Sequence, residues 1–361
     1  MKSAFSARIR SHHVCAVLLS VCVVVGASGD GGVMRYKYTA EPLTYRFVMQ
    51  TVTEMSGGMF GDASMKSAFQ QAGLCDITTK SSSGGASVVE MTYTALKMHQ
   101  DNPMGGGTFF DTTSPEFKAS KKEDMDSLAR AMSSMVGVGI TLTVDGRGNV
   151  SKVEHTDMFT DMIKELGAHG PGTTAAIEQM FGEDGIKSLF SQLFVVLPET
   201  AIKPGESWTT SSITKVPVLG GIKRTAVWKY VGDESIGGRS VARFNGVISM
   251  ESVPAEPGAK AEIPGMQMSI DGQGNESSAV VFFDVDAGRM MSFSLSGEMP
   301  ATMSIKMPPM GNQPEKTMTM KMKSKMGSKM TLVGKDAPVD PDGAVKKPEA
   351  GAAVGASTKG Q

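Results

Sequence analysis

The chain has 361 residues with 36 Lys and Arg against 37 Asp and Glu, a formal net charge of −1 at pH 7. A nucleic-acid surface needs a strongly basic balance, so this composition argues against nucleic acid as a partner. Low aromatic content (6%), 42 glycines and many Thr, Ser and Val favour sheet structure over a helical bundle.

The N-terminus has the three parts of a secretory signal peptide. Basic residues precede an apolar run from Val14 to Ala27, and small residues follow it. A membrane span needs about 20 apolar residues, so this run predicts a signal peptide over residues 1–27 that is cleaved after export. We therefore expect a mature chain in the periplasm or outside the cell, without a membrane span.

The cysteines offer an alternative at the same end. Cys22 follows a sequence that loosely resembles a lipid-attachment box, but Val21 is bulky for the position before the cysteine, which disfavours lipoprotein anchoring. Cleavage near Ala27 leaves only Cys75, which has no internal disulfide partner. We interpret Cys75 as a small buried apolar residue rather than a reactive thiol.

Residues 33–155 are predicted to form a first β meander. Apolar and polar residues alternate in the expected strands Thr44–Met55 and Gly84–Met98. The clearest local signal is a hairpin over Gly139–His155, with a tight turn at Asp145–Gly148 that supplies the residues for positive φ angles.

Residues 156–198 have a helical period and are predicted to form a helical connector. Apolar residues recur at helical spacing in Thr156–Gly167 and in Glu183–Phe194, and a shorter helix is expected over Ala175–Phe181. Another helix is predicted over Glu123–Met135. Such amphipathic helices are expected to pack on one face of a sheet.

Residues 199–333 are predicted to form a second β meander. Its Gly237–Met250 segment aligns with Gly84–Met98, and its hairpin over Ser277–Gly297 has the pattern of the first hairpin, which together indicate an internal repeat. The last stretch, 334–361, has little apolar mass and is predicted to be a disordered tail.

The residues that catalysis requires are scarce. Beyond the signal peptide the three histidines, His99, His155 and His169, lack the spacing of a shared metal site and are interpreted as partly exposed surface residues. There is no G-x-S-x-G elbow, no P-loop and no C-x-x-C motif. We therefore predict no catalytic residues, no cofactor and no enzymatic activity; a hydrolase whose site is not recognisable is the minor alternative.

Methionine is the one unusual component, with 29 residues in the chain. Met318, Met320 and Met322 alternate with Thr319 and Lys321, as in a strand with one inward face. Thioether sulfur also suits Cu(I), so these three methionines form an alternative metal site. Because methionine replaces leucine and isoleucine elsewhere in the chain, we favour a structural role and expect the strand face that carries these three methionines to be covered.

The order of segments resembles that of an uncharacterised family of exported bacterial proteins, a domain of unknown function (DUF6263-like). The similarity rests on FFDTTSPE from Phe109, the hairpin ITLTVDGRGNVSKVEH, and above all Phe-x-x-Leu-Pro followed by Pro-Gly-Glu-Ser-Trp within Phe194–Trp208. It extends over Tyr36–Leu332. The resemblance implies export and a β-rich fold, and it assigns no activity or catalytic residue.

Together these features predict an α+β fold. Two antiparallel meanders would form a curved sheet or half-barrels, with the central helices packed on one face. The function expected is that of a non-enzymatic envelope protein that binds an apolar small molecule or an envelope protein in the concavity. A copper-binding envelope protein is the alternative.

Overall fold

The described chain is almost entirely β-structure. The computed structural model describes residues 33–57, 63–101, 107–120, 127–154, 183–191, 194–216, 220–253, 267–271, 275–307 and 316–346. In these ranges 66% of the residues lie in strands. The predicted signal peptide, His155, His169 and the helices expected over Thr156–Gly167 and Ala175–Phe181 lie outside them.

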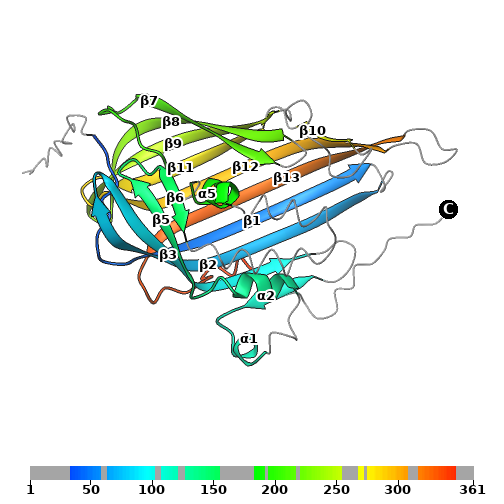
Figure 1. Cartoon of the computed structure of the whole chain (residues 1–361), viewed down its shortest axis with the longest axis horizontal. Coiled ribbons are helices and arrows are strands. Elements are labelled where there is room, and N and C mark those ends of the chain that lie inside the picture. Colours follow the sequence, from blue (N-terminus) through cyan, green and yellow to red (C-terminus); the bar gives the residue numbers. More distant parts are fainter. Residues whose placement is uncertain are drawn as a thin grey trace, which may run out of the picture. The chain divides into compact units, whose positions relative to one another are not determined.

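Thirteen strands of the described ranges form a single antiparallel sheet (Figure 1). In chain order they are β1 Leu43–Gly57, β2 Ser64–Ser83, β3 Ala86–Gln100, β4 Thr108–Asp111, β5 Gly139–Asp145, β6 Val150–Glu154, β7 Ser207–Val216, β8 Gly220–Ile236, β9 Arg239–Val253, β10 Gln267–Asp271, β11 Asn275–Asp284, β12 Arg289–Met307 and β13 Lys316–Val333. The helices are α1 Pro115–Ala119, α2 Ser127–Ser133 and α5 Glu183–Ser191.

The strand order is β6-β5-β3-β2-β1-β13-β12-β11-β9-β8-β7, with β4 beside β3 and β10 beside β12. Each half therefore runs in chain order, and the long ladder between β1 and β13 joins the first strand to the last. The sheet edges at the ends of this order are β6 and β7, the two strands on either side of the chain's midpoint.

The predicted α+β class is wrong. The helices of the described ranges are short, of five, seven and nine residues, and no helical layer covers the sheet there. The sequence pattern overstated them because a helical period shows only that a segment is amphipathic. In the region of the expected helix Glu123–Met135, for example, helix is described only over α2.

Four hairpin turns meet at one end of the strands, called here the turn end. The β2–β3 turn at Gly84–Gly85 has φ angles of 62° and 82°, and the β8–β9 turn at Gly237–Gly238 has 59° and 77°. Successive positive φ angles match the twist of a two-residue hairpin, and glycine adopts them without strain. The β5–β6 and β11–β12 turns likewise place Gly148 and Gly288 at positive φ. The two halves thus share strand order and turn chemistry, while the duplication itself stays a prediction.

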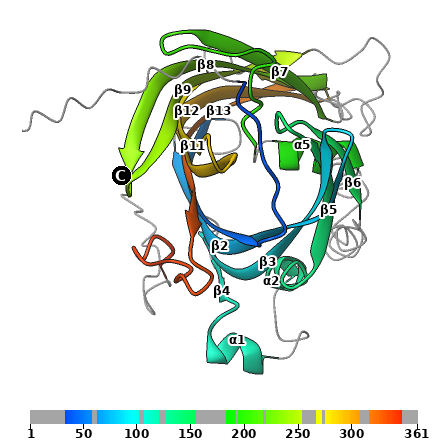
Figure 2. The same ribbon diagram turned by 90° about the vertical axis from the view of Figure 1, so that its left-hand side faces the viewer.

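The sheet curls, so that α5 lies between its two edges, β6 and β7 (Figure 2). Because residues paired across antiparallel strands share a face, the ladders identify the concave face, which carries the main core. Its largest fully buried side chains include Phe190 on α5, Phe244 on β9 and Phe283 on β11.

Two segments outside the sheet fill the concavity at the turn end. Residues 33–38 cross it and link two turns, because the Tyr36 and Lys37 N–H groups donate to the carbonyls of Gly146 and Gly288, both at 2.7 Å. Residues 194–202, called here the strap, bury Leu197 completely in the same core. Residues 33–38 and the strap therefore contribute Tyr36 and Leu197 to the main core at this end.

The described part of the C-terminal stretch does not match the predicted disordered tail. Residues 334–346 form turns that pack on β1, β2 and β3, where Val345 is buried. The Asp340 carboxylate accepts the N–H groups of Ala344 and Val345 and lies 3.2 Å from the Lys97 ammonium. Local hydrogen bonds thus order a segment of low apolar content; residues 347–361 lie outside the described ranges.

Candidate ligand-binding cavity

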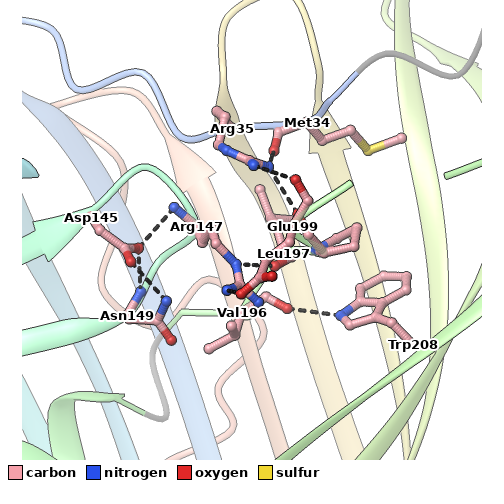
Figure 3. Close-up of polar contacts among 10 residues, drawn as sticks. Met34, Arg35, Asp145, Arg147, Asn149, Val196, Leu197, Glu199 and Trp208 are labelled. Atoms are coloured by element: carbon pink, nitrogen blue, oxygen red, sulfur yellow. Dashed lines mark hydrogen bonds and ion pairs between the residues drawn. The ribbon is translucent and has the colours of Figure 1, made fainter. Parts of the chain in front are cut away.

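The residues that carry the family resemblance form a clasp at the turn end (Figure 3). The Leu197 N–H donates to the Arg147 carbonyl at 2.8 Å, and Arg147 Nε donates back to the Leu197 carbonyl at 2.9 Å. Arg35 donates to the carbonyls of Pro198 and Glu199 at 2.8 and 2.6 Å. The Phe-x-x-Leu-Pro segment therefore has a structural role, because its backbone groups are the partners that hold two loops to the sheet.

Trp208 completes this clasp at the start of β7. Its indole Nε1 donates to the Val196 carbonyl at 2.8 Å, and its ring stacks on that of Trp228 with centroids 6.3 Å apart. The preceding Pro204-Gly205 forms a turn, with Gly205 at a φ of 93°. The ring lies on the sheet, as the sequence predicted.

Asp145 stabilises the β5–β6 turn, to which the strap is hydrogen-bonded through Leu197. Its carboxylate accepts the N–H groups of Arg147 and Asn149 and the Asn149 side-chain amide, at 2.8 to 2.9 Å. Burial acts to raise the pKa of Asp145, but these hydrogen bonds to the charged form outweigh it, so the pKa is lowered.

A cavity of about 470 Å³ lies where α5 meets β7 and the strap, and we call it the seam cavity. Its volume is in the range of small-molecule sites. The hydroxyls of Ser188 on α5 and Thr214 on β7 are 2.6 Å apart and join the helix to the sheet edge beside it. The apolar lining comes from the following side chains: Val150, Phe194, Val195, Val196, Ile213, Trp228 and Phe293.

Arg224 is the distinctive polar group of this cavity. It lies on β8, opposite Ser212 of β7 and Met250 of β9, on the same face as the buried Ala226 and Trp228. Among the described residues its guanidinium has no hydrogen-bond or ion-pair partner. Burial lowers the pKa of Arg224, although a guanidinium stays protonated in proteins. The cavity therefore contains a partly desolvated, unpaired positive charge.

The other polar lining residues described are also basic or neutral. Lys187 on α5 is a second cation, hydroxyls come from both α5 and β7, and none of the described lining residues is Asp or Glu. Apolar walls, hydroxyl groups and, among the described lining residues, charges of positive sign alone are suited to a molecule that has an apolar body and an anionic head.

The concave face beyond the core is rich in methionine. Strand register places half-buried methionines of four strands on this face, and we call them the methionine face: Met49, Met55, Met65, Met299, Met318, Met320, Met322 and Met326. Met318, Met320 and Met322 share one face of β13 as predicted, with exposed Lys321 and Lys323 on the other. These three methionines were expected to be covered by helix or by the opposing sheet, but they are only half-buried.

The structure also changes which methionines are neighbours. Met55 on β1 is directly opposite Met65 on β2 and Met322 on β13, so these three side chains form a row across adjacent strands. Only Met322 belongs to the set chosen from sequence, because cross-strand partners cannot be read from the spacing within one strand.

No catalytic constellation is found in the part of the chain that the structure describes. Within it, no group of three or more His, Cys, Asp or Glu side chains could hold a metal. His99 is buried rather than partly exposed as expected, with its Nε2 3.0 Å from the Asp101 carboxylate. Cys75 is buried, and burial raises its thiol pKa. Across the described ranges, the helices are too short or too polar to span a bilayer.

Arg224 and Lys187 were not recognised from the sequence. Arg224 could have been found from the alternation of side chains along its strand. It falls on the same face as Ala226, Trp228 and Tyr230, where an apolar residue is expected. Lys187 belongs to a predicted amphipathic helix, but nothing in the sequence indicated that this helix would lie beside β7.

The fold and the cavity define an all-β protein with a ligand-sized cavity at the seam of a curled sheet. Within that class, the chain belongs to a family of unknown function (DUF6263), whose pattern matches residues 84–288. No curated protein matches the sequence.

Comparison with solved structures finds distant likenesses. "Lipid-protein interactions in lipovitellin" describes a structure with a TM-score of 0.37 and 11% identity; the match covers 86% of this chain and 27% of that one, so this chain spans about a quarter of its length. OccK5 (OpdH) of Pseudomonas aeruginosa has a TM-score of 0.21 and 6% identity, covering 82% and 99%. A DUF1329 family protein from Desulfovibrio piger has 0.13 and 6%, covering 78% and 83%. Scores this low carry no argument about function.

Proposed function

We propose that this protein is a non-enzymatic, exported cell-envelope protein that binds an apolar small molecule in the seam cavity. The observation that carries the proposal is the cavity itself, about 470 Å³ in volume, with aromatic and aliphatic walls. The signal-peptide pattern of residues 1–27 supports export. A small molecule fits better than a protein partner, because the apolar surface at this place is concave and of ligand size.

The neighbouring structure supports a ligand site rather than a packing defect. Trp228 forms one wall, and its ring stacks on that of its cross-strand partner Trp208, which the strap fixes through its indole hydrogen bond. Preorganised walls of this kind lower the entropic cost of binding. The clasp would then have a second role, which is to hold the cavity open at the seam.

Binding can be tested with the neutral fluorescent probe N-phenyl-1-naphthylamine, whose emission rises in apolar surroundings. We expect saturable binding to the full mature chain and a loss of affinity in Thr210→Phe, which places a ring into the cavity. Thr209→Phe is the matched control, because Thr209 is exposed and on the opposite side of β7 from Thr210. Absence of saturable binding, or equal effects of the two variants, would refute the proposal. Cell fractionation and the intact mass of the purified chain test export and cleavage.

A second candidate function is Cu(I) binding, favoured by the row of Met55, Met65 and Met322. Adjacent strands lie about 4.8 Å apart, and flexible thioether side chains can converge across that distance. Thioether ligands select soft ions such as Cu(I).

Anaerobic Cu(I) titration of the wild type decides this candidate. Stoichiometric binding should be abolished when Met55, Met65 and Met322 are all replaced by leucine, and it should persist in Met318→Leu, which lies outside the row. Binding that is absent from the wild type, or unchanged in the triple variant, would eliminate a copper site at this row.

A further inference from the structure

We propose that the seam cavity selects a single-chain amphiphile with an anionic head, and that Arg224 binds that head. This inference rests on the proposed function and specifies its ligand. It starts from the position of Arg224, which shares the concave face with Trp228 while its side chain lines the cavity.

Arg224 differs from three other cations of β8 and β9, which are paired with acidic residues. Lys223, the preceding residue, faces the other side of β8 and lies 3.8 Å from the Glu251 carboxylate. Arg243 on β9 lies 2.9 Å from Glu234, and Arg239 lies 3.3 Å from Asp284. Arg224 has no acidic partner in the described ranges, although it is half-buried.

An unpaired charge in such surroundings is costly unless a partner of opposite sign is supplied. A carboxylate or phosphate from a ligand would meet this need, and a guanidinium can bind either one through two parallel hydrogen bonds. The Ser212 hydroxyl, directly opposite Arg224, and Lys187 on α5 are further donors at the cavity wall. A basic head would meet two like charges, and none of the described lining residues is acidic.

The apolar part of the ligand would lie against Trp228, Phe194 and Phe293. Arg224 and Trp228 lie on the same face of β8 with Ala226 between them, about 13 Å apart at the rise of a β-strand, so the head-group site and the apolar wall follow one another along one strand. The cavity thus offers a site for the head group at Arg224 and a site for the apolar chain at Trp228.

The head group can be tested with three probes that share a similar chain: oleate, oleyl alcohol and oleoyl lysophosphatidate. The chain contains two tryptophans, Trp208 and Trp228, and both lie at the cavity wall or against it, so their intrinsic fluorescence reports binding directly. We expect oleate to bind more tightly than oleyl alcohol. The lysophosphatidate arm shows whether a phosphate head is accepted in place of a carboxylate.

The decisive variant is Arg224→Gln, with Lys223→Gln as the matched control because it removes the same charge from the opposite face. A charged hydrogen-bonded contact corresponds to roughly a ten- to hundredfold change in affinity. Arg224→Gln should weaken binding of the acids by that factor and leave oleyl alcohol within about twofold, while Lys223→Gln changes neither. Thermal unfolding of each variant shows that the fold is retained.

The outcomes separate the two proposals. If the acids and the alcohol bind equally and Arg224→Gln alters neither, the head-group inference is wrong and the apolar cavity stands. If none of the probes and no neutral fluorophore binds, the proposed function fails and the inference with it. Equal losses in Arg224→Gln and Lys223→Gln would show a non-specific effect of net charge and would also overturn the inference.

Discussion

Replacing Gly246 by alanine should destabilise the protein through a clash with Trp228. Gly246 on β9 is directly opposite Trp228 on β8, and a Cβ at position 246 would lie 2.5 Å from the Trp228 ring. The ring would have to retreat by roughly half an ångström to reach even 3.0 Å, the limit that real Cβ contacts respect. Trp228 is 2% exposed and stacks on Trp208, so the retreat disturbs packed neighbours.

Inserting atoms into a packed core typically costs about 1 to 3 kcal/mol, and we expect Gly246→Ala to lower the free energy of unfolding by that amount. Urea denaturation followed by tryptophan emission measures it, because Trp228 is itself the residue displaced. Gly327→Ala is the control: this strand glycine would place its Cβ where no atom lies within 4 Å, so its stability should stay within about 0.5 kcal/mol of the wild type.

A double-mutant cycle tests the mechanism. The smaller ring in Trp228→Phe relieves the contact, so the combined variant should be less destabilised than the sum of the single changes. A Gly246→Ala protein as stable as the wild type, or strictly additive effects, would show that the two residues do not meet as the register places them.

Four further predictions follow from the buried and hydrogen-bonded groups. Trp208 is half-buried and packs against the core, so Trp208→Ala should cost about 3 kcal/mol of unfolding free energy, the lower end of the range for truncated core aromatics, and a loss below roughly 1 kcal/mol in urea denaturation would contradict the clasp. Replacing Met318, Met320 and Met322 by leucine should change stability by less than about 1.5 kcal/mol per site; a larger loss would show that thioether flexibility is needed there. Cys75 should resist a thiol reagent in the folded protein and react on unfolding, because burial raises its pKa; rapid native modification would show the site is open. The pKa of Asp145 is lowered in the fold, so its stabilising effect is complete above the unfolded value of about 3.9 and is lost as pH falls through the lower folded value. Asp145→Asn should therefore reduce the acid sensitivity of stability below about pH 4, and an unchanged pH profile would refute this.

Local turn chemistry could be predicted from the sequence, and the long-range pairing could not. The hairpin of β5 and β6 and that of β11 and β12 occur where alternation and Asp-Gly or Ala-Gly turns indicated them. The ladder between β1 and β13 joins residues such as Thr44 and Val333. Nothing in the sequence around either residue specifies the other, since register is set by the faces that become buried together.

The sequence overestimated the helical content and did not predict the cavity, because amphipathic spacing does not show where a helix packs. Amphipathic spacing over Glu183–Phe194 predicted a helix correctly at α5, but not that it would lie between two sheet edges. The cavity depends on that placement, because its wall combines α5, β7 and the strap. Arg224 was visible only as a charged residue on an otherwise apolar strand face, which becomes meaningful once the curvature of the sheet is known.

The most direct test of the account is a crystal structure of the full mature chain with 9,10-dibromostearate, in which anomalous scattering locates the bromine atoms. We predict bromine peaks in the seam cavity beside Trp228, with the carboxylate at the Arg224 guanidinium. Bromine on the methionine face alone, or a carboxylate that points away from Arg224 into solvent, would contradict the account.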